Sequence, residues 1–131
     1  MGASSEHFTL AELACPHCGK SECTPELMNA LEAFRAVVSR PVLIDSAYRC
    51  AEHNKAVGGK PNSQHLLGNA ADVRVLELDP PALERAARLV NSIKGIGRST
   101  PPFRYLHVDV RPTPAEWCYN AEGSEIPYFS A

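Results

Sequence analysis

The sequence predicts an α+β fold in which helices pack with a small, mainly antiparallel sheet. Amphipathic helical segments alternate along the chain with short apolar segments of strand character. The chain has 131 residues, 44% hydrophobic and 21% charged, which is typical of a globular domain with a real core. We therefore expect a single domain over residues 1–131, with a cysteine-rich N-terminal loop at residues 15–23.

Two helices are predicted in the first third of the chain by their N-terminal signals. Thr9 is the expected cap of a short helix over residues 9–14. Thr24 and Pro25 begin a longer helix, because a threonine hydroxyl caps well and proline fits the first helical position. We expect Pro41 to end it. Apolar residues at steps of three and four give this helix one face for core packing: Leu27, Leu31, Phe34, Val37 and Val38.

Three short strands are expected at residues 42–44, 70–75 and 105–110. The first is apolar throughout, which indicates a buried strand. In the third, His107 and Asp109 stand two residues apart and should share one face of the sheet.

Two more helices are expected, at residues 50–57 and from Pro80 onward. A glycine pair at residues 58–59 closes the first. The Gly-Ile-Gly segment at residues 95–97 is expected to end the second. The apolar face of the second helix consists of Leu83, Ala86, Ala87, Val90 and Ile93.

Charge and hydropathy restrict the partners. A net charge of -2 leaves no room for a large basic surface, so nucleic acid is not expected. No apolar run approaches the ~20 residues needed to span a bilayer. The N-terminus lacks the basic start and apolar stretch of a secretory signal. We expect a monomer made in the cytoplasm, which would reach a cell wall only after release or by another export route.

Two histidines and an aspartate form a candidate metal site. His65 is expected on a loop, Asp72 on the strand that follows and His107 on a neighbouring strand. Gly68 and the small residues at 70–71 let the chain turn tightly between the first two. Catalytic zinc sites use three such ligands and keep a fourth position open for water. Isolated histidines and aspartates more often have structural or surface roles, so this spacing alone is a modest signal.

A wider set of motifs supports this interpretation. They are Ser46-Ala47-Tyr48-Arg49, His53-Asn54, Val57-Gly58-Gly59, Ser63-Gln64-His65, Gly68, Ala70-Ala71-Asp72 and His107-Val108-Asp109. Together they resemble the zinc D-Ala-D-Ala carboxypeptidase family, which belongs with the lysostaphin-type and hedgehog-type zinc folds. The resemblance runs over residues 9–111 and is strongest in the Ser-x-His motif with its Asp seven residues after the His. Within the family it is closest to the compact phage and prophage branch.

The resemblance implies a function and a set of site residues. His65, Asp72 and His107 would be ligands of Zn2+, and Arg49 would face the carbonyl or carboxylate of the substrate. The reaction would be hydrolysis of a peptide bond in peptidoglycan stem peptides, of carboxypeptidase or endopeptidase type. Ser63 is expected either to contact the substrate near the metal loop or to support a turn.

The general base is the point at which this chain departs from part of the family. Several branches place a carboxylate three residues before the last histidine, where this chain has Arg104. Asp109 is the nearest alternative. It could be a catalytic base, or it could orient a ligand histidine from behind. Glu52 and His53 are weaker candidates, and Glu52 could instead form a surface ion pair with Arg49.

Four of the five cysteines fall in the first half of the chain. Cys15, Cys18 and Cys23 resemble a small metal knuckle that Cys50 could complete, and His17 could join it. An odd cysteine count without a signal argues against a disulfide framework. Free thiols or a single disulfide remain alternatives.

The segment after Pro112 is rich in turn residues, with Trp117 as its expected anchor. Trp117, Tyr119, Tyr128 and Phe129 could line a groove for a glycan or peptide, although packing of the tail is the simpler explanation.

Two other functions compete with the zinc peptidase. One is a catalytically weak or inactive zinc module that binds cell-wall peptides or serves in a phage particle. The other is a zinc-knuckle interaction protein, which leaves His65, Asp72 and His107 unexplained.

Overall fold

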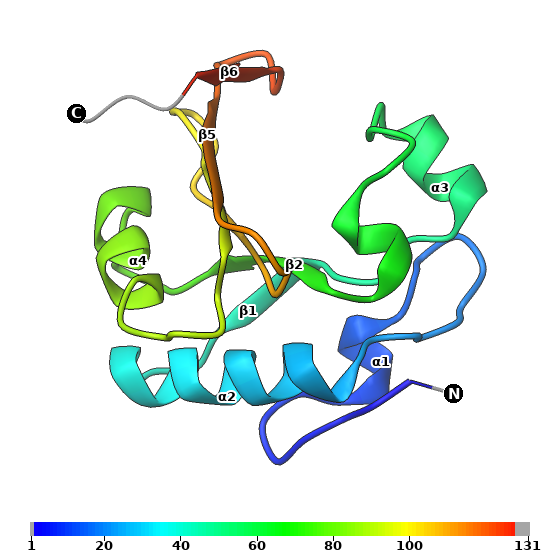
Figure 1. The fold of residues 1–131 in the computed structure, drawn as a ribbon, viewed down its shortest axis with the longest axis horizontal. Coiled ribbons are helices and arrows are strands. Elements are labelled where there is room, and N and C mark those ends of the chain that lie inside the picture. Colours follow the sequence, from blue (N-terminus) through cyan, green and yellow to red (C-terminus); the bar gives the residue numbers. More distant parts are fainter. Residues whose placement is uncertain (1, 128–131) are drawn as a thin grey trace.

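The computed structural model describes residues 2–127, in which helices and strands are interleaved up to α4 and four consecutive strands follow. The helices are α1 (Leu10–Leu13), α2 (Pro25–Val38), α3 (Ala51–Ala56), the 3-10 helix η1 (Gln64–Leu67) and α4 (Pro80–Ala87). The strands are β1 (Leu43–Ser46), β2 (Ala70–Arg74), β3 (Gly95–Arg98), β4 (Leu106–Asp109), β5 (Ala115–Tyr119) and β6 (Glu125–Pro127). Figure 1 shows α4 and α3 on opposite sides of the strands. None of the helices described is long and apolar enough to cross a membrane.

The two predicted threonine caps are confirmed. The Thr9 hydroxyl accepts a hydrogen bond from the Glu12 N–H, and the Glu12 carboxylate accepts one from the Thr9 N–H, which makes a capping box. The Thr24 hydroxyl accepts from the Leu27 N–H at 3.2 Å. The longer helix, α2, ends at Val38, three residues before Pro41, where Ser39 adopts a left-handed conformation with φ 55°.

The strands form one sheet in the order β1-β2-β4-β3-β5-β6. Within residues 2–127 every neighbouring pair is antiparallel except β3 and β5, which are parallel. The predicted α+β class with a mainly antiparallel sheet is therefore confirmed. The expectation of a buried first strand is wrong: β1 alternates between exposed and half-buried residues, because it lies at an edge of the sheet.

Two segments near the C-terminus differ from the prediction. α4 ends at Ala87, and Gly95–Arg98 does not end a helix but forms β3 in the middle of the sheet. Val90 and Ile93 are buried, but they lie in the turns between α4 and β3. The segment after Pro112, expected as turns, adds β5 and β6. Short apolar runs flanked by glycine are ambiguous between helix and strand, and here strand pairing decides.

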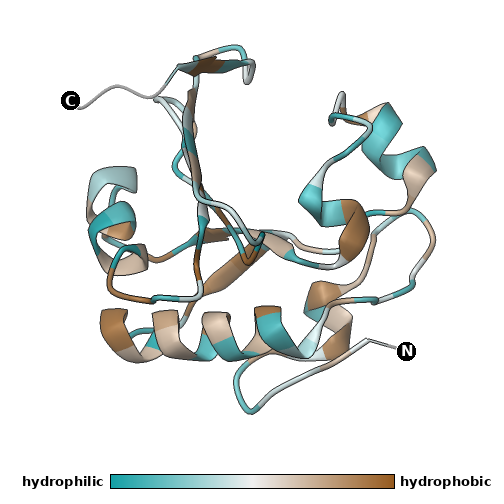
Figure 2. Ribbon diagram, in the orientation of Figure 1, coloured by the Kyte–Doolittle hydropathy of each residue, from teal (hydrophilic) through white to brown (hydrophobic). Residues whose placement is uncertain are grey.

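The core lies between α2, α4 and one face of the sheet (Figure 2). Residues of β2 and β4 alternate, so that Val73 and Val108 enter the core while Asp72 and His107 point to the other face. Each fully buried leucine or phenylalanine contributes about 1.5–3 kcal/mol. Most of the predicted face of α2 is buried, but Val37 is 40% exposed and does not belong to the core. The largest fully buried side chains of the two helices are Leu27, Leu31, Phe34 and Leu83.

Candidate metal centre

One row of residues crosses the polar face of the sheet. Asp72 on β2 is paired with His107 on β4, which is paired with Gly97 on β3. Gly97 is paired in turn with Trp117 on β5, and Asp72 has Ser46 of β1 on its other side. Paired residues in neighbouring strands present their side chains on the same face. The register of the sheet therefore sets Asp72 and His107 side by side.

His65 reaches this row from η1. The Ser63 hydroxyl caps η1 by accepting from the His65 N–H, and Gly68 ends it with φ 72°. Ring atom Nδ1 of His65 donates to the carbonyl of Ala47 at 2.6 Å. Because a carbonyl only accepts, Nδ1 carries the proton of this hydrogen bond, and Nε2 is the ring nitrogen that faces the site. The Nε2 atom lies 3.3 Å from Oδ1 of Asp72.

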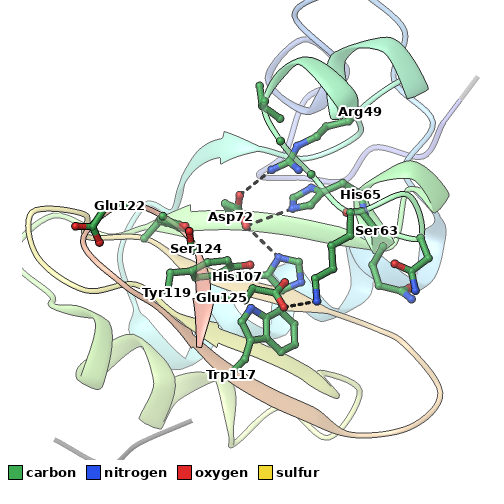
Figure 3. Close-up of a pocket in the computed structure, with 18 of the residues that line it drawn as sticks. Arg49, Ser63, His65, Asp72, His107, Trp117, Tyr119, Glu122, Ser124 and Glu125 are labelled. Atoms are coloured by element: carbon green, nitrogen blue, oxygen red, sulfur yellow. Dashed lines mark hydrogen bonds and ion pairs between the residues drawn. The ribbon is translucent and has the colours of Figure 1, made fainter. Parts of the chain in front are cut away.

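Three ligand atoms converge on one point. Oδ1 of Asp72 lies 3.1 Å from Nδ1 of His107, and the three candidate ligand atoms all lie within 4.8 Å of one another. All three residues are buried in the protein, with at most 9% of their surface exposed. Tetrahedral zinc with bonds of about 2.0–2.1 Å separates its nitrogen and oxygen ligands by about 3.3–3.4 Å. The donor types and spacings therefore fit a zinc ion (Figure 3).

The charges of the site suit a cation. Burial would raise the pKa of Asp72, but His65 and His107 hold the pKa of this carboxyl well below its usual range. Burial likewise works against a charged His107, yet hydrogen bonds from its ring to Asp109 and Asp72 raise its pKa to about 9. Without a metal, the two carboxylates thus retain a proton on His107. A divalent cation would take the place of that proton.

Asp109 lies behind His107. Its Oδ2 accepts from Nε2 of His107 at 2.7 Å, on the ring edge opposite the nitrogen that faces Asp72. Arg111 donates to both carboxylate oxygens, at 2.8 and 2.7 Å, and holds the pKa of Asp109 low together with His107, against the effect of burial. The Asp109 side chain is wholly buried. This position suits a residue that orients a ligand histidine and does not suit a base that must reach water in the cavity.

Gly95 and Gly97 of β3 leave space for the side chains of Asp109 and Trp117, a feature that was not predicted from the sequence. A Cβ atom on Gly95 would stand 2.2 Å from both carboxylate oxygens of Asp109. A Cβ atom on Gly97 would stand 2.6 Å from Nε1 of Trp117. The spacing of two residues is the period of one strand face, and this was the signal available in the sequence. The Trp117 ring then lies 5.0 Å from the ring of His107.

Arg49 contacts the site directly. Its Nη2 lies 3.3 Å from Oδ2 of Asp72, Nε donates to the Ser46 hydroxyl at 3.1 Å, and Nη1 donates to Asn54 at 3.3 Å. The alternative ion pair with Glu52 does not form; the Glu52 carboxylate lies 3.5 Å from Nε2 of His17. Arg49 is therefore held at the site by three side chains.

A cavity of about 590 Å³ opens above the three candidate ligands. Arg49 and Ser63 line one side, and Trp117 and Tyr119 line another, so these aromatic residues do more than pack the tail. Tyr128 and Phe129 lie outside the described residues. Two further lining residues form an ion pair: Nζ of Lys60 lies 2.6 Å from the carboxylate of Glu125. Glu52 and His53 do not line this cavity in the described part of the chain.

Comparison with protein families gives a match over residues 6–109 to the family described as Peptidase M15. The matched segment contains the three candidate ligands, Arg49 and Asp109. The chain belongs to the peptidase M15 family. This membership confirms the resemblance to zinc D-Ala-D-Ala carboxypeptidases and makes the chain a metallopeptidase of a zinc-dependent family. None of the curated proteins compared with the chain matches it.

The M15 match ends at Asp109, so β5 and β6 lie outside the matched segment. Part of the cavity wall of this M15 peptidase, including Trp117 and Glu125, therefore comes from chain beyond the match.

The early cysteines are brought together only in part. Sulfur atoms of Cys15, Cys18 and Cys50 lie within 4.8 Å of one another. Cys23 is instead part of the hydrophobic core, and burial raises the pKa of its thiol to about 11. The predicted set of four cysteines is therefore wrong in one member, since the apolar surroundings of Cys23 disfavour the thiolate that binds metal.

Proposed function

We propose that this chain is a zinc peptidase that hydrolyses a peptide bond in peptidoglycan stem peptides. The observation that carries the proposal is the convergence of His65, Asp72 and His107 at the base of an open cavity. The family membership supports a peptidase, and the motif resemblance supports peptidoglycan as the substrate.

The three side chains would hold zinc through Nε2 of His65, Oδ1 of Asp72 and Nδ1 of His107. A zinc ion bound there supplies an activated water and polarises the scissile carbonyl. The chain itself sets the geometry, because Ala47 and Asp109 each bind the ring nitrogen that is turned away from the proposed metal. Such partners fix the tautomer and the orientation of a ligand histidine.

Arg49 is proposed to bind the substrate. Its guanidinium group lies beside the metal ligands and lines the cavity, where it can hold the developing oxyanion or a terminal carboxylate. Ser63 also lines the cavity, although its hydroxyl already caps η1. Lys60 and Arg111 also line the cavity, but each is already paired with a carboxylate, Lys60 with Glu125 and Arg111 with Asp109.

The proton of the attacking water must pass to a base that the cavity contains. Asp109 is better placed to orient His107, and Arg104 is exposed and cationic. Besides Asp72, the carboxylates among the described lining residues are Glu122 and Glu125. We assign the base to this pair of glutamates. Turnover of Glu122→Gln and Glu125→Gln at saturating zinc tells them apart, and full activity in both would reject the assignment.

A second candidate function is a zinc-containing module that binds cell-wall peptides without cleaving them. The observation that favours it is Arg104, which stands where several branches of the family have a carboxylate. In this case neither Glu122 nor Glu125 would act as a base. The unmodified protein and both glutamine variants would then bind peptide without cleaving it.

A panel of defined stem peptides tests the proposal. Zinc-loaded protein should release either a terminal residue or two fragments, identified by mass, and a chelator should stop the reaction. His65→Ala should lose the zinc ion of the cavity and the cleavage while it stays folded. Peptide binding without any cleavage across the panel would reject the enzyme and favour the binding module.

A further inference from the structure

Residues 15–20 form a tight turn near the N-terminus. The Cys15 N–H donates to the Lys20 carbonyl at 2.8 Å, and the Gly19 N–H donates to the Cys15 carbonyl at 2.8 Å. Gly19 has φ +77°, a conformation that glycine adopts without strain. This turn brings the sulfur atoms of Cys15 and Cys18 together within one short loop.

A third sulfur arrives from a distant part of the chain. Cys50 is the N-cap of α3, and its Sγ lies 3.7 Å from Sγ of Cys15. A disulfide needs about 2.05 Å, so the two thiols are not bonded. Nδ1 of His17 lies 3.6 Å from Sγ of Cys50. Three sulfurs therefore gather at one place outside the cavity described above, and one imidazole nitrogen lies beside the sulfur of Cys50.

These distances match those between ligands of a single zinc ion. With zinc–sulfur bonds of about 2.3 Å and tetrahedral angles, two sulfurs stand about 3.8 Å apart. A sulfur and a nitrogen ligand stand about 3.6 Å apart on the same geometry. We propose that Cys15, His17, Cys18 and Cys50 bind a second zinc ion with a structural role. Four protein ligands leave no open position, as in structural rather than catalytic zinc sites.

The surroundings of Cys15 favour its thiolate form. Burial opposes ionisation of Cys15, but backbone N–H groups of Cys50, Cys18 and His17 donate to its sulfur and lower its pKa to about 7. The His53 N–H donates to Cys50, yet partial burial and the nearby sulfurs of Cys15 and Cys18 raise the pKa of Cys50. A bound cation would stabilise the Cys50 thiolate beside the negative sulfur of Cys15, and so would lower the pKa of Cys50.

This second metal would join two parts of the chain, the turn at residues 15–20 and the start of α3, which follows the cavity residue Arg49. Cys50 directly follows Arg49, whose N–H donates to the carbonyl of His65 at 3.2 Å. The Tyr48 N–H donates to the Leu13 carbonyl at 3.3 Å, beside the cysteine turn. The ion would therefore tie the N-terminal segment to the start of α3 and hold the backbone of Arg49 in place.

Metal content and cobalt spectroscopy test the second site independently of any peptidase activity. Reduced, unmodified protein should bind about two zinc ions per chain, whereas Cys18→Ser and His65→Ala should each bind about one. Cobalt(II) should give thiolate charge-transfer absorption in the unmodified protein and in His65→Ala. It should give none in Cys18→Ser. Because the unmodified protein is itself measured, the test does not depend on the stability of a variant.

A matched pair of variants identifies the fourth ligand. Cys23→Ala should retain both zinc ions, and His17→Ala should lose the cysteine-bound ion or bind it at least tenfold more weakly. The reverse result would exclude His17. A zinc content of one that Cys18→Ser leaves unchanged would overturn the proposal, as would an absence of thiolate–cobalt absorption. A Cys15–Cys50 disulfide that mass spectrometry still finds after preparation with a reductant would overturn it too.

Discussion

Asp109 and His107 lie two residues apart on β4, and the Asp109 carboxylate accepts from Nε2 of His107 at 2.7 Å. Asp109→Asn should therefore weaken zinc binding by about 10–100-fold, as is usual when the partner of a ligand histidine is changed. Turnover at saturating zinc should be largely retained. Competition with a chelator measures the affinity. Normal affinity combined with lost turnover would instead restore Asp109 as the base.

A substitution at Gly95, on the neighbouring strand β3, tests the same hydrogen bond between Asp109 and His107. Alanine there would place a Cβ atom 2.2 Å from both Asp109 oxygens, so the carboxylate would have to move away from His107. Gly95→Ala should lower zinc affinity by about 10–100-fold. Gly97→Ala is the matched control, because its Cβ would meet Trp117 and not Asp109. Equal zinc affinity in the two variants would contradict the role given to the space beside Gly95.

Arg49 should act on the substrate and not on the metal. Arg49→Lys keeps the positive charge but loses the planar group that contacts Ser46, Asn54 and Asp72. We expect kcat/KM to fall about 100-fold with zinc content unchanged. Arg104→Lys is the control at an exposed arginine and should leave kcat/KM unaltered. An Arg49→Lys enzyme with normal kcat/KM would remove the substrate role.

The pKa of His107 predicts how the stability of the metal-free protein depends on pH. Its pKa is raised from 6.5 to about 9 in the folded state, so the folded protein binds this proton more tightly than the unfolded chain. The resulting stabilisation is complete below about pH 6.5 and disappears as the pH rises towards about 9. Its size should be on the order of 1–3 kcal/mol.

Urea unfolding of metal-free protein between about pH 6 and pH 10 measures this effect. The free energy of unfolding should decline across the range, and the decline should be smaller in His107→Gln. The carboxylates of Asp72 and Asp109 have lowered pKa values and stay ionised throughout, so they add no slope. Parallel curves for the two proteins would show that His107 does not hold the extra proton.

Local features of the fold could be predicted from the sequence because they depend on neighbouring residues. Thr9 and Thr24 cap helices through bonds to residues three positions further on. The apolar face of α2 follows from the helical period, and the shared face of His107 and Asp109 follows from the strand period. The choice of His65, Asp72 and His107 as candidate ligands also came from the sequence, and the structure brings these three together.

Other features were decided by strand pairing and packing between distant residues. The sequence could not show that Gly95 stands opposite Asp109, which makes β3 a central strand and leaves room for the carboxylate. Nor could it show that His17, and not Cys23, lies beside Cys50. Sheet register and core packing join residues far apart in the chain. The composition and spacing of the sequence determined which groups this protein has for binding metal, and only the tertiary structure decided which of them meet.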